Sequence, residues 1–488
     1  MENPEWAEAQ MNVISIDLIA KTKKHIEFLK AIDDNGKLYN GPILERAIFR
    51  YKYYWLPLLA KHNKFKVIEW PLVVKLDCEW IWHCHRLNPV RYVADCKKVY
   101  GRILDPCGVV ISSVEGTCKK KTEELWNKMY PKEPYELDFD NCFDNDNDND
   151  IESKLISSAS TTYDLVSAVK RQSSFFYQVS REFMKDGIFL EGAVQRYKGF
   201  LHLIRRNMES KVENFSVPTY DIDLVWHTHQ LHPQSYCNDT VSLLGKVLDH
   251  DDNDTKDQRL DVGFAKTTQQ WKEVFSSRYW RAGAMYRVHH PPTPTNPIHP
   301  FETTLFVEIM VEVIEVRNLS VNHKDSLFLS VSKKPRDDVL FKDKTQFTIC
   351  TKSTHETQAL LFQCEPKGEL LFELIDDSPK SLGTCSILLA DLDSKLATPK
   401  WLEFESGERV PVTLGIVIST TQPSPVQLSL TNSGEQSFDV WATGGMCSGS
   451  GGGGCGSGCG GGGGGGGGCR ASCGGCRSRC GGGNCSAK

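Results

Sequence analysis

The pattern Trp-His-x-His occurs twice in this chain, at residues 82–85 and again at residues 226–229. The segments around it align without a gap, 77–105 with 221–249, and the matches include the Trp, both His and a following Pro and Tyr. These residue types are among the least exchangeable by chance. The duplication therefore predicts two copies of one fold, and it constrains the chain more than any other feature.

The similarity extends on both sides of the motif. The string Leu-Glu-x-Ala-x-x-Arg-Tyr-Lys at 44–52 returns at 190–198, and Lys-Thr-x-x-x-Trp at 121–126 returns at 266–271. The repeat is thus a domain of about 130 residues rather than a local motif. Apolar residues at helical spacing, as in 12–33, and few strand signals predict a mainly α-helical copy, an irregular bundle.

Length and charge describe ordinary folded domains. The chain has 488 residues, a net charge of −5 and 24% charged residues, which predicts about three domains and excludes a nucleic-acid binder held by bulk charge. No stretch of about 18 apolar residues and no secretory signal occurs, so we expect the cytosol or the nucleus and no transmembrane segment. In such a compartment the scattered cysteines are expected to be buried thiols.

The pattern changes after residue 300. The run 305–316 is rich in β-branched residues, and further short runs follow at 327–331, 346–350, 370–375, 385–389 and 412–418. Such strands, separated by turn residues, predict an antiparallel β-sandwich. The strings VEVIEVRNLS and GELLFELIDDSPKSLGTCSILLADL, with a later Trp-Leu pair at 401–402, resemble a C2 domain. This resemblance implies lipid or protein binding, but with too few clustered Asp residues (325, 376 and 377) for calcium.

The last 45 residues contain 23 glycines and eight cysteines, a composition that cannot form a packed core. The spacing of Cys473 and Cys476 occurs in zinc knuckles, but a flexible tail is the preferred interpretation, with weak RNA contact as an alternative. The predicted domains are helical repeat 1 (8–137), an acidic Asp/Asn linker (138–157), helical repeat 2 (158–288), a Pro-rich linker (289–300), a C2-like β-sandwich (301–420), a linker (421–443) and a disordered Gly/Cys-rich tail (444–488).

The two histidines of each motif lie two residues apart. On a helix that begins with Asp77 or Asp221 as its cap, such residues point in directions about 200° apart and cannot share one ligand sphere. Residues four apart on a helix can share one ligand sphere, and such pairs are Glu79 with His83 and Asp223 with His227. The candidate motif residues, structural or metal-binding, are Asp77, Trp82, His83, His85, Tyr92, Asp221, Trp226, His227, His229, His232 and Tyr236.

Three interpretations of the motif remain open. The preferred one is a polar-aromatic plug that holds two helices of each copy together. The second is a metal site, with zinc as the ion, or a catalytic site, and the third is a pocket for a peptide or small ligand. No cofactor is predicted beyond that zinc alternative. No nucleophile with an orienting base and no phosphate-binding glycine loop stands out in the sequence.

The doubled strings DCEWIWHCHRLNPVRY and DIDLVWHTHQLHPQSY, the strand-rich segment and the Gly/Cys tail together resemble the glycine-rich domain-containing proteins of plants. This resemblance implies a non-enzymatic regulatory or adaptor role in growth and in stress or hormone responses. The expected partners are proteins, with RNA through the tail or a membrane surface through the C2-like domain as further candidates. The alternatives are a metal-dependent enzyme that uses the paired motifs and an RNA-binding protein.

Overall fold

The computed structural model describes sixteen stretches of the chain. The Pro-rich linker and the Gly/Cys-rich tail with Cys473 and Cys476 lie outside them, as does nearly all of the acidic linker. The described residues are 3–62, 70–110, 116–139, 161, 163–212, 214–250, 257–279, 281–284, 303–319, 327–337, 341, 344–349, 358–376, 381–392, 398–404 and 411–427.

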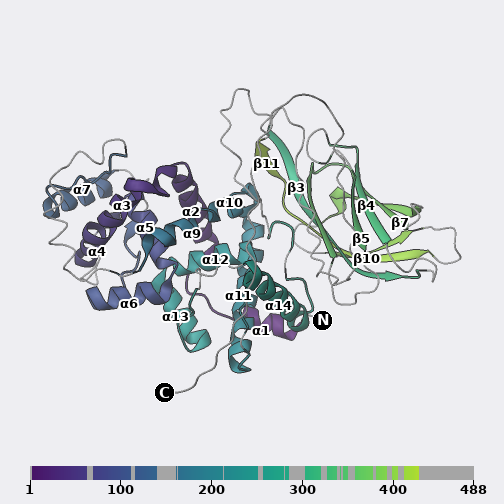
Figure 1. Ribbon diagram of the computed structural model, residues 1–488, viewed down its shortest axis with the longest axis horizontal. Coiled ribbons are helices and arrows are strands. Elements are labelled where there is room, and N and C mark those ends of the chain that lie inside the picture. Colours follow the sequence, from purple (N-terminus) through teal and green to yellow (C-terminus); the bar gives the residue numbers. More distant parts are fainter. Residues whose placement is uncertain are drawn as a thin grey trace, which may run out of the picture. The chain divides into compact units, whose positions relative to one another are not determined.

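The N-terminal part is helical in both copies, as predicted (Figure 1). Each motif lies on one helix, α5 or α12, and the following proline opens the next helix. The helices of the first copy are α1 (Pro4–Gln10), α2 (Leu18–Asp33), α3 (Gly41–Arg50), α4 (Leu56–His62), α5 (Leu76–Arg86), α6 (Pro89–Tyr100) and α7 (Thr117–Met129). Those of the second are α9 (Leu165–Gln172), α10 (Phe175–Val179), α11 (Gly187–Glu209), α12 (Tyr220–Gln230), α13 (Pro233–Leu244) and α14 (Asp257–Phe275).

The starts of the motif helices differ from the prediction. The residues at the cap positions are Lys75 and Thr219, so Asp77 and Asp221 lie inside the first turn and do not cap α5 and α12. Both carboxylates are buried instead, where an arginine of an earlier helix of the same copy binds each of them. The ends of the next helices are alike in the two copies. Both α6 and α13 stop at an aligned glycine with φ near +70°, a conformation that glycine adopts without strain.

One helix of each copy, α2 or α9, packs against the other copy. α2 and α9 both begin after a capping aspartate, Asp17 or Asp164, followed by a leucine, so they are equivalent elements. α2 contacts α11 and α12 of the second copy, whereas α9 contacts α5 and α3 of the first. The apolar cores reflect this packing: Leu18 at the start of α2 belongs to the core of the second copy, whereas Leu165 of α9 belongs to that of the first, together with Ile26, Leu29 and Ile32 farther along α2. The copies therefore interlock rather than enclose two independent cores.

The C-terminal part is an antiparallel sandwich of two sheets, as expected for a C2-like domain (Figure 1). One sheet has the order β11-β3-β10-β9, with β6 also paired to β3, and the other has the order β5-β4-β7-β8. The predicted runs are all strands, and β6, β9 and β11 are additional. The strands are β3 (Thr303–Arg317), β4 (Leu327–Lys334), β5 (Thr345–Ile349), β6 (Gln358–Cys364), β7 (Glu369–Asp376), β8 (Ser381–Leu388), β9 (Thr398–Phe404), β10 (Val412–Thr420) and β11 (Ser424–Gln427).

A short segment after α14 bonds to the first of these sheets. The backbone N–H of Gly283 donates to the carboxylate of Glu308 on β3 at 2.6 Å, and that of Ala282 donates to Ser419 on β10 at 2.9 Å. Glu308 is buried, and burial raises the pKa of its carboxyl group. Of the predicted calcium-loop aspartates, Asp325 and Asp377 lie outside the described residues, and Asp376 ends β7.

Candidate functional site

The first aligned contact is a buried ion pair. Arg50 of α3 binds Asp77 at 2.6 Å, and Arg196 of α11 binds Asp221 at 2.8 Å, each through its Nε atom. The two arginines belong to the repeated Leu-Glu-x-Ala-x-x-Arg string, which had no assigned role. Burial opposes the charge of Arg50, but Asp77, Cys78 and Glu133 together outweigh this effect and raise the pKa of the guanidinium. These pairs join α5 to α3 and α12 to α11.

The second aligned contact joins the motif tryptophan to the tyrosine of the next helix. Trp82 donates from Nε1 to the hydroxyl of Tyr92 at 2.8 Å, which in turn donates to the Leu104 carbonyl at 2.6 Å. In the second copy Trp226 donates to Tyr236 at 2.9 Å, and Tyr236 donates to the Leu248 carbonyl at 2.9 Å. All four rings are buried. This contact fits the packing interpretation of the motif.

The second histidine of each motif has a partner at both ring nitrogens. His229 lies between the Tyr197 hydroxyl, 3.0 Å from Nδ1, and Asp239, 3.1 Å from Nε2. His85 has the Tyr51 hydroxyl 2.9 Å from Nδ1, with an Asp95 oxygen 3.3 Å from Nε2. Burial lowers the pKa of both imidazoles, against the opposing effect of the aspartates. Asp95 and Asp239 are also aligned, a match that the motif analysis missed.

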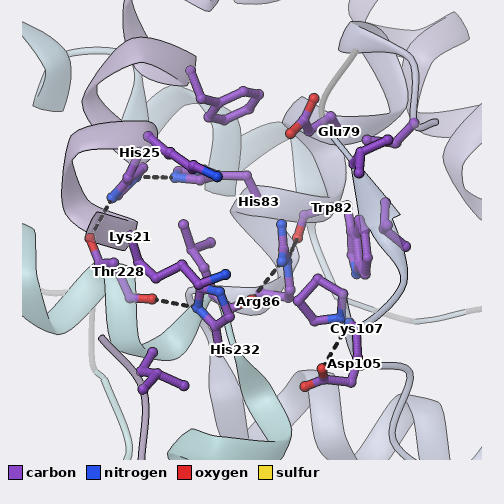
Figure 2. Close-up of a pocket in the computed structure, with 18 of the residues that line it drawn as sticks. Lys21, His25, Glu79, Trp82, His83, Arg86, Asp105, Cys107, Thr228 and His232 are labelled. Atoms are coloured by element: carbon purple, nitrogen blue, oxygen red, sulfur yellow. Dashed lines mark hydrogen bonds between the residues drawn. The ribbon is translucent and has the colours of Figure 1, made fainter. Parts of the chain in front are cut away.

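The first histidine differs between the copies. His83 Nε2 lies 2.9 Å from Nε2 of His25 on α2, and His25 Nδ1 lies 2.9 Å from the Thr228 hydroxyl (Figure 2). The Thr228 hydroxyl donates to the Leu224 carbonyl, so it must accept from His25 Nδ1–H. His25 Nε2 therefore accepts from His83 Nε2–H. Burial, followed by the neighbouring histidines and Arg86, holds the pKa of both imidazoles well below the usual range.

His227 has different neighbours. Its Nε2 lies 3.3 Å from Asp223 Oδ1, the pair four residues apart that the sequence predicted, and 3.3 Å from Nε2 of His250. Burial lowers the pKa of His227 to about 4, so its imidazole is neutral at physiological pH. These three residues form one of two groups in the described chain with the spacing of metal ligands. In the other, Glu5, Glu8 and His202, both carboxylates already pair with arginines of α11.

A cavity of about 520 Å³ lies where the two copies meet (Figure 2). Its basic side chains are Lys21, Lys24, His25, His83, Arg86 and His232, and its acidic ones are Glu79 and Asp105.

The histidines of this cavity are not free cations. His232 donates from Nδ1 to the Thr228 carbonyl at 3.1 Å, and burial lowers its pKa to about 4. The sequence had marked His232 as a candidate of the second motif, and it named neither His25 nor Arg86 nor His250. Of these three residues, only His250 could have been suspected from the sequence, because it directly follows Asp249, the last residue of the aligned segment.

Two family models match most of the described chain. The model described as "Glycine-rich domain-containing protein-like" matches residues 2–95 and 91–239, and "C2 domain of glycine-rich domain-containing protein" matches residues 303–422. In Arabidopsis thaliana, "Glycine-rich domain-containing protein 2" is 48% identical over 459 residues, which is 87% of this chain. The chain belongs to the glycine-rich domain-containing protein family.

A second member of the family, "Glycine-rich domain-containing protein 1" of the same plant, is 47% identical over 472 residues and 88% of this chain. The chain spans 57% of the length of each of these relatives. Among solved structures, a C2 domain of plant extended synaptotagmin 1 is similar at 14% identity and a TM-score of 0.19, over 25% of this chain and 96% of that one. Within the described ranges no helix combines the length and apolarity that a membrane crossing requires.

Proposed function

We propose that this protein is a non-enzymatic regulatory adaptor in plant growth and in stress or hormone responses, acting in the cytosol or nucleus through protein partners. We propose further that its interlocked helical copies bind a small anionic molecule in the cavity between them. The family assignment supports the regulatory role. One observation supports the ligand: the buried charge of Arg86 forms no ion pair with a carboxylate of the described residues, and Glu79 and Asp105 act on it only from a longer distance.

The guanidinium of Arg86 is only 6% exposed and lies over the Trp82 ring at 4.1 Å. It donates to two main-chain carbonyls, that of Leu231 at 2.6 Å and that of Trp82 at 3.3 Å. Among the described residues no carboxylate approaches it within ion-pair distance, and burial lowers its pKa. A buried charge without a counter-ion is costly, so an anion in the cavity would stabilise the protein.

The surroundings of Arg86 suit a small anion. Lys21 and Lys24 are exposed residues on α2 that also line the cavity, and their ammonium groups add charge to it. A cavity of about 520 Å³ has the size of a small-molecule site. Because the lining comes from both copies, a bound anion would strengthen the contact between them. A stronger contact between the copies would couple binding of the anion to the protein surfaces that bind partners.

Two features support binding rather than turnover. The imidazoles of His25 and His83 are hydrogen-bonded to each other, and those of His85 and His229 are held between a tyrosine and an aspartate. Nitrogen atoms with such partners are poorly placed to accept a proton from a substrate.

The test uses the full-length protein and the variant Arg86→Gln, which places in the first copy the residue found at the equivalent position 230. Calorimetric titration at constant ionic strength would use inorganic phosphate and citrate as probes. We expect saturable binding and a higher melting temperature for at least one probe, and at least a tenfold loss of affinity in Arg86→Gln. Lys30→Gln, on the exposed face of α2, is the control. Absent binding, or equal binding by Arg86→Gln, would contradict the proposal.

The other partners remain predictions. RNA binding rests on the cationic tail, and membrane binding rests on the C2-like assignment of residues 303–422. Deletion after Val440 tests the first by RNA retention at low salt. Binding of the sandwich to anionic vesicles tests the second, and its absence would remove it.

A further inference from the structure

We propose that Asp223, His227 and His250 bind a zinc ion. Asp223 and His227 lie one turn apart on α12, so their side chains project from the same face. His250 comes from the segment that follows α13. The three ligand atoms are Oδ1 of Asp223 and Nε2 of each histidine.

The distances between these atoms fit one ion. His227 Nε2 lies 3.3 Å from both other atoms, and His250 Nε2 lies 3.8 Å from Asp223 Oδ1. Zinc bonds of about 2.0–2.2 Å to nitrogen and oxygen place tetrahedral ligand atoms about 3.3–3.6 Å apart. The three side chains thus need little movement to coordinate the ion. Nitrogen ligands favour zinc over calcium or magnesium, which prefer oxygen.

The surroundings of the group direct its three ligand atoms toward one another. His250 Nδ1 lies 3.2 Å from the Leu87 carbonyl and donates to it, so the ring presents its Nε2 to Asp223 and His227. Asp223 Oδ1 is buried, and the Nε2 atoms of His227 and His250 lie 3.3 and 3.8 Å from it, which is longer than a well-formed hydrogen bond. A cation between the three atoms would bind all of them at once.

The first copy cannot form this site. The positions equivalent to Asp223, His227 and His250 hold Glu79, His83 and Pro106, and proline offers no ligand. His83 instead bonds to His25. The zinc site therefore belongs to the second copy alone. It ties the segment after α13 to α12 and, through the Leu87 carbonyl, to the first copy. Three protein ligands leave a fourth position for water or for a group from a partner.

The decisive measurement is the zinc content of the full-length protein after chelation and reloading. The tail cysteines can bind zinc in every variant. The zinc bound at Asp223, His227 and His250 is therefore measured as the difference in zinc content between each variant and the unsubstituted protein. We expect His250→Gln and Asp223→Asn each to lose one equivalent of zinc. The matched controls His83→Gln and His202→Gln should keep it. Equal zinc content in all five proteins, or a loss of one equivalent in His83→Gln as well, would overturn the proposal.

A second measurement needs no folding-sensitive variant. Cobalt(II) added to the unsubstituted protein with alkylated cysteines should give the intense visible bands of a four-coordinate ion without thiolate charge-transfer absorption. Zinc should displace these bands at one equivalent. A spectrum of hexa-aqua cobalt alone would overturn the proposal. Neither measurement involves Arg86, so the anion cavity and the zinc site can fail separately.

Discussion

At the scale of single residues, the motif histidines show how one residue type serves different purposes. His85 stays between Tyr51 and Asp95 and joins neighbouring helices, whereas His83 and His25 hydrogen-bond to each other at the junction of the copies. Burial makes these imidazoles neutral, and the pKa of His232 falls to about 4 for the same reason. Their free energy of burial should therefore depend strongly on pH.

We expect the protein to lose stability as the pH falls from about 6.5 toward 4. In this window the unfolded chain protonates its histidines near pH 6.5, while the folded chain holds His25, His83 and His85 neutral because their pKa values are lowered. The variant His25→Gln should reduce the slope by up to about 1.4 kcal/mol per pH unit.

Urea unfolding at several pH values measures this slope. Lys30→Gln on the same helix is the control and should leave it unchanged. A slope in His25→Gln as steep as in the unsubstituted protein would show that His25 protonates equally well in both states.

At the scale of elements, the packing of α2 and α9 against the other copy decides how the helical region behaves. Each of these helices buries a leucine in the core of the other copy. Their capping aspartates and apolar faces are visible in the sequence, but the two copies offer similar surfaces to such a helix. Only the length and course of the chain between the helices select the partner. The consequence is one cooperative unit instead of two.

Leu18→Ala in α2 should therefore destabilise both copies together. Truncation of a buried leucine costs about 2–5 kcal/mol, and Leu165→Ala in α9 should cost a similar amount. Hydrogen exchange followed by mass spectrometry should show reduced protection in α5 and in α11 for either variant. Val13→Ala, at a residue that is 82% exposed, serves as the control. Loss of protection confined to α11–α13 in Leu18→Ala would mean that the copies fold independently.

At the scale of the whole described chain, the helical region and the sandwich share buried apolar contacts, since Phe306 and Met310 of β3 belong to the helical cores, and they share polar contacts as well. Glu308 accepts from the Gly283 N–H at 2.6 Å, although it is buried and its pKa is raised. A carboxyl group whose pKa is raised in the folded chain stabilises the fold only while it is protonated. Its contribution to stability is complete below the unfolded pKa and is lost as the pH rises through the folded value.

Glu308→Gln should keep the acceptor oxygen without the charge. We expect its stability to match or exceed that of the unsubstituted protein at pH 7, with the advantage growing as the pH rises toward the pKa of Glu308 and remaining constant above it. Glu308→Leu removes the acceptor and should cost about 1–3 kcal/mol, because the Gly283 N–H stays buried without a partner. Denaturation curves at pH 5, 7 and 8.5 measure both effects. A Gln variant less stable than the Leu variant would contradict this account.

Sequence alone was sufficient for the two helical copies, the helix that carries each motif and six of the nine described strands of the sandwich. Each of these depends on the spacing of apolar residues and on local breakers such as Pro89 and Gly101, which act within a few residues of the chain. The same alignment paired Asp77 with Asp221 and Tyr92 with Tyr236, so it marked the packing residues even where it assigned Asp77 the wrong role.

Tertiary structure alone decided which residues meet the first histidine of each motif. His25 reaches His83 because α2 packs between the two copies, and His250 reaches His227 because the chain turns back after α13. Neither contact leaves a periodic signal, since residues 58 and 23 positions apart are joined only by the path of the backbone. The doubled motif therefore identifies the fold, while its two different surroundings create the anion cavity and the proposed zinc site.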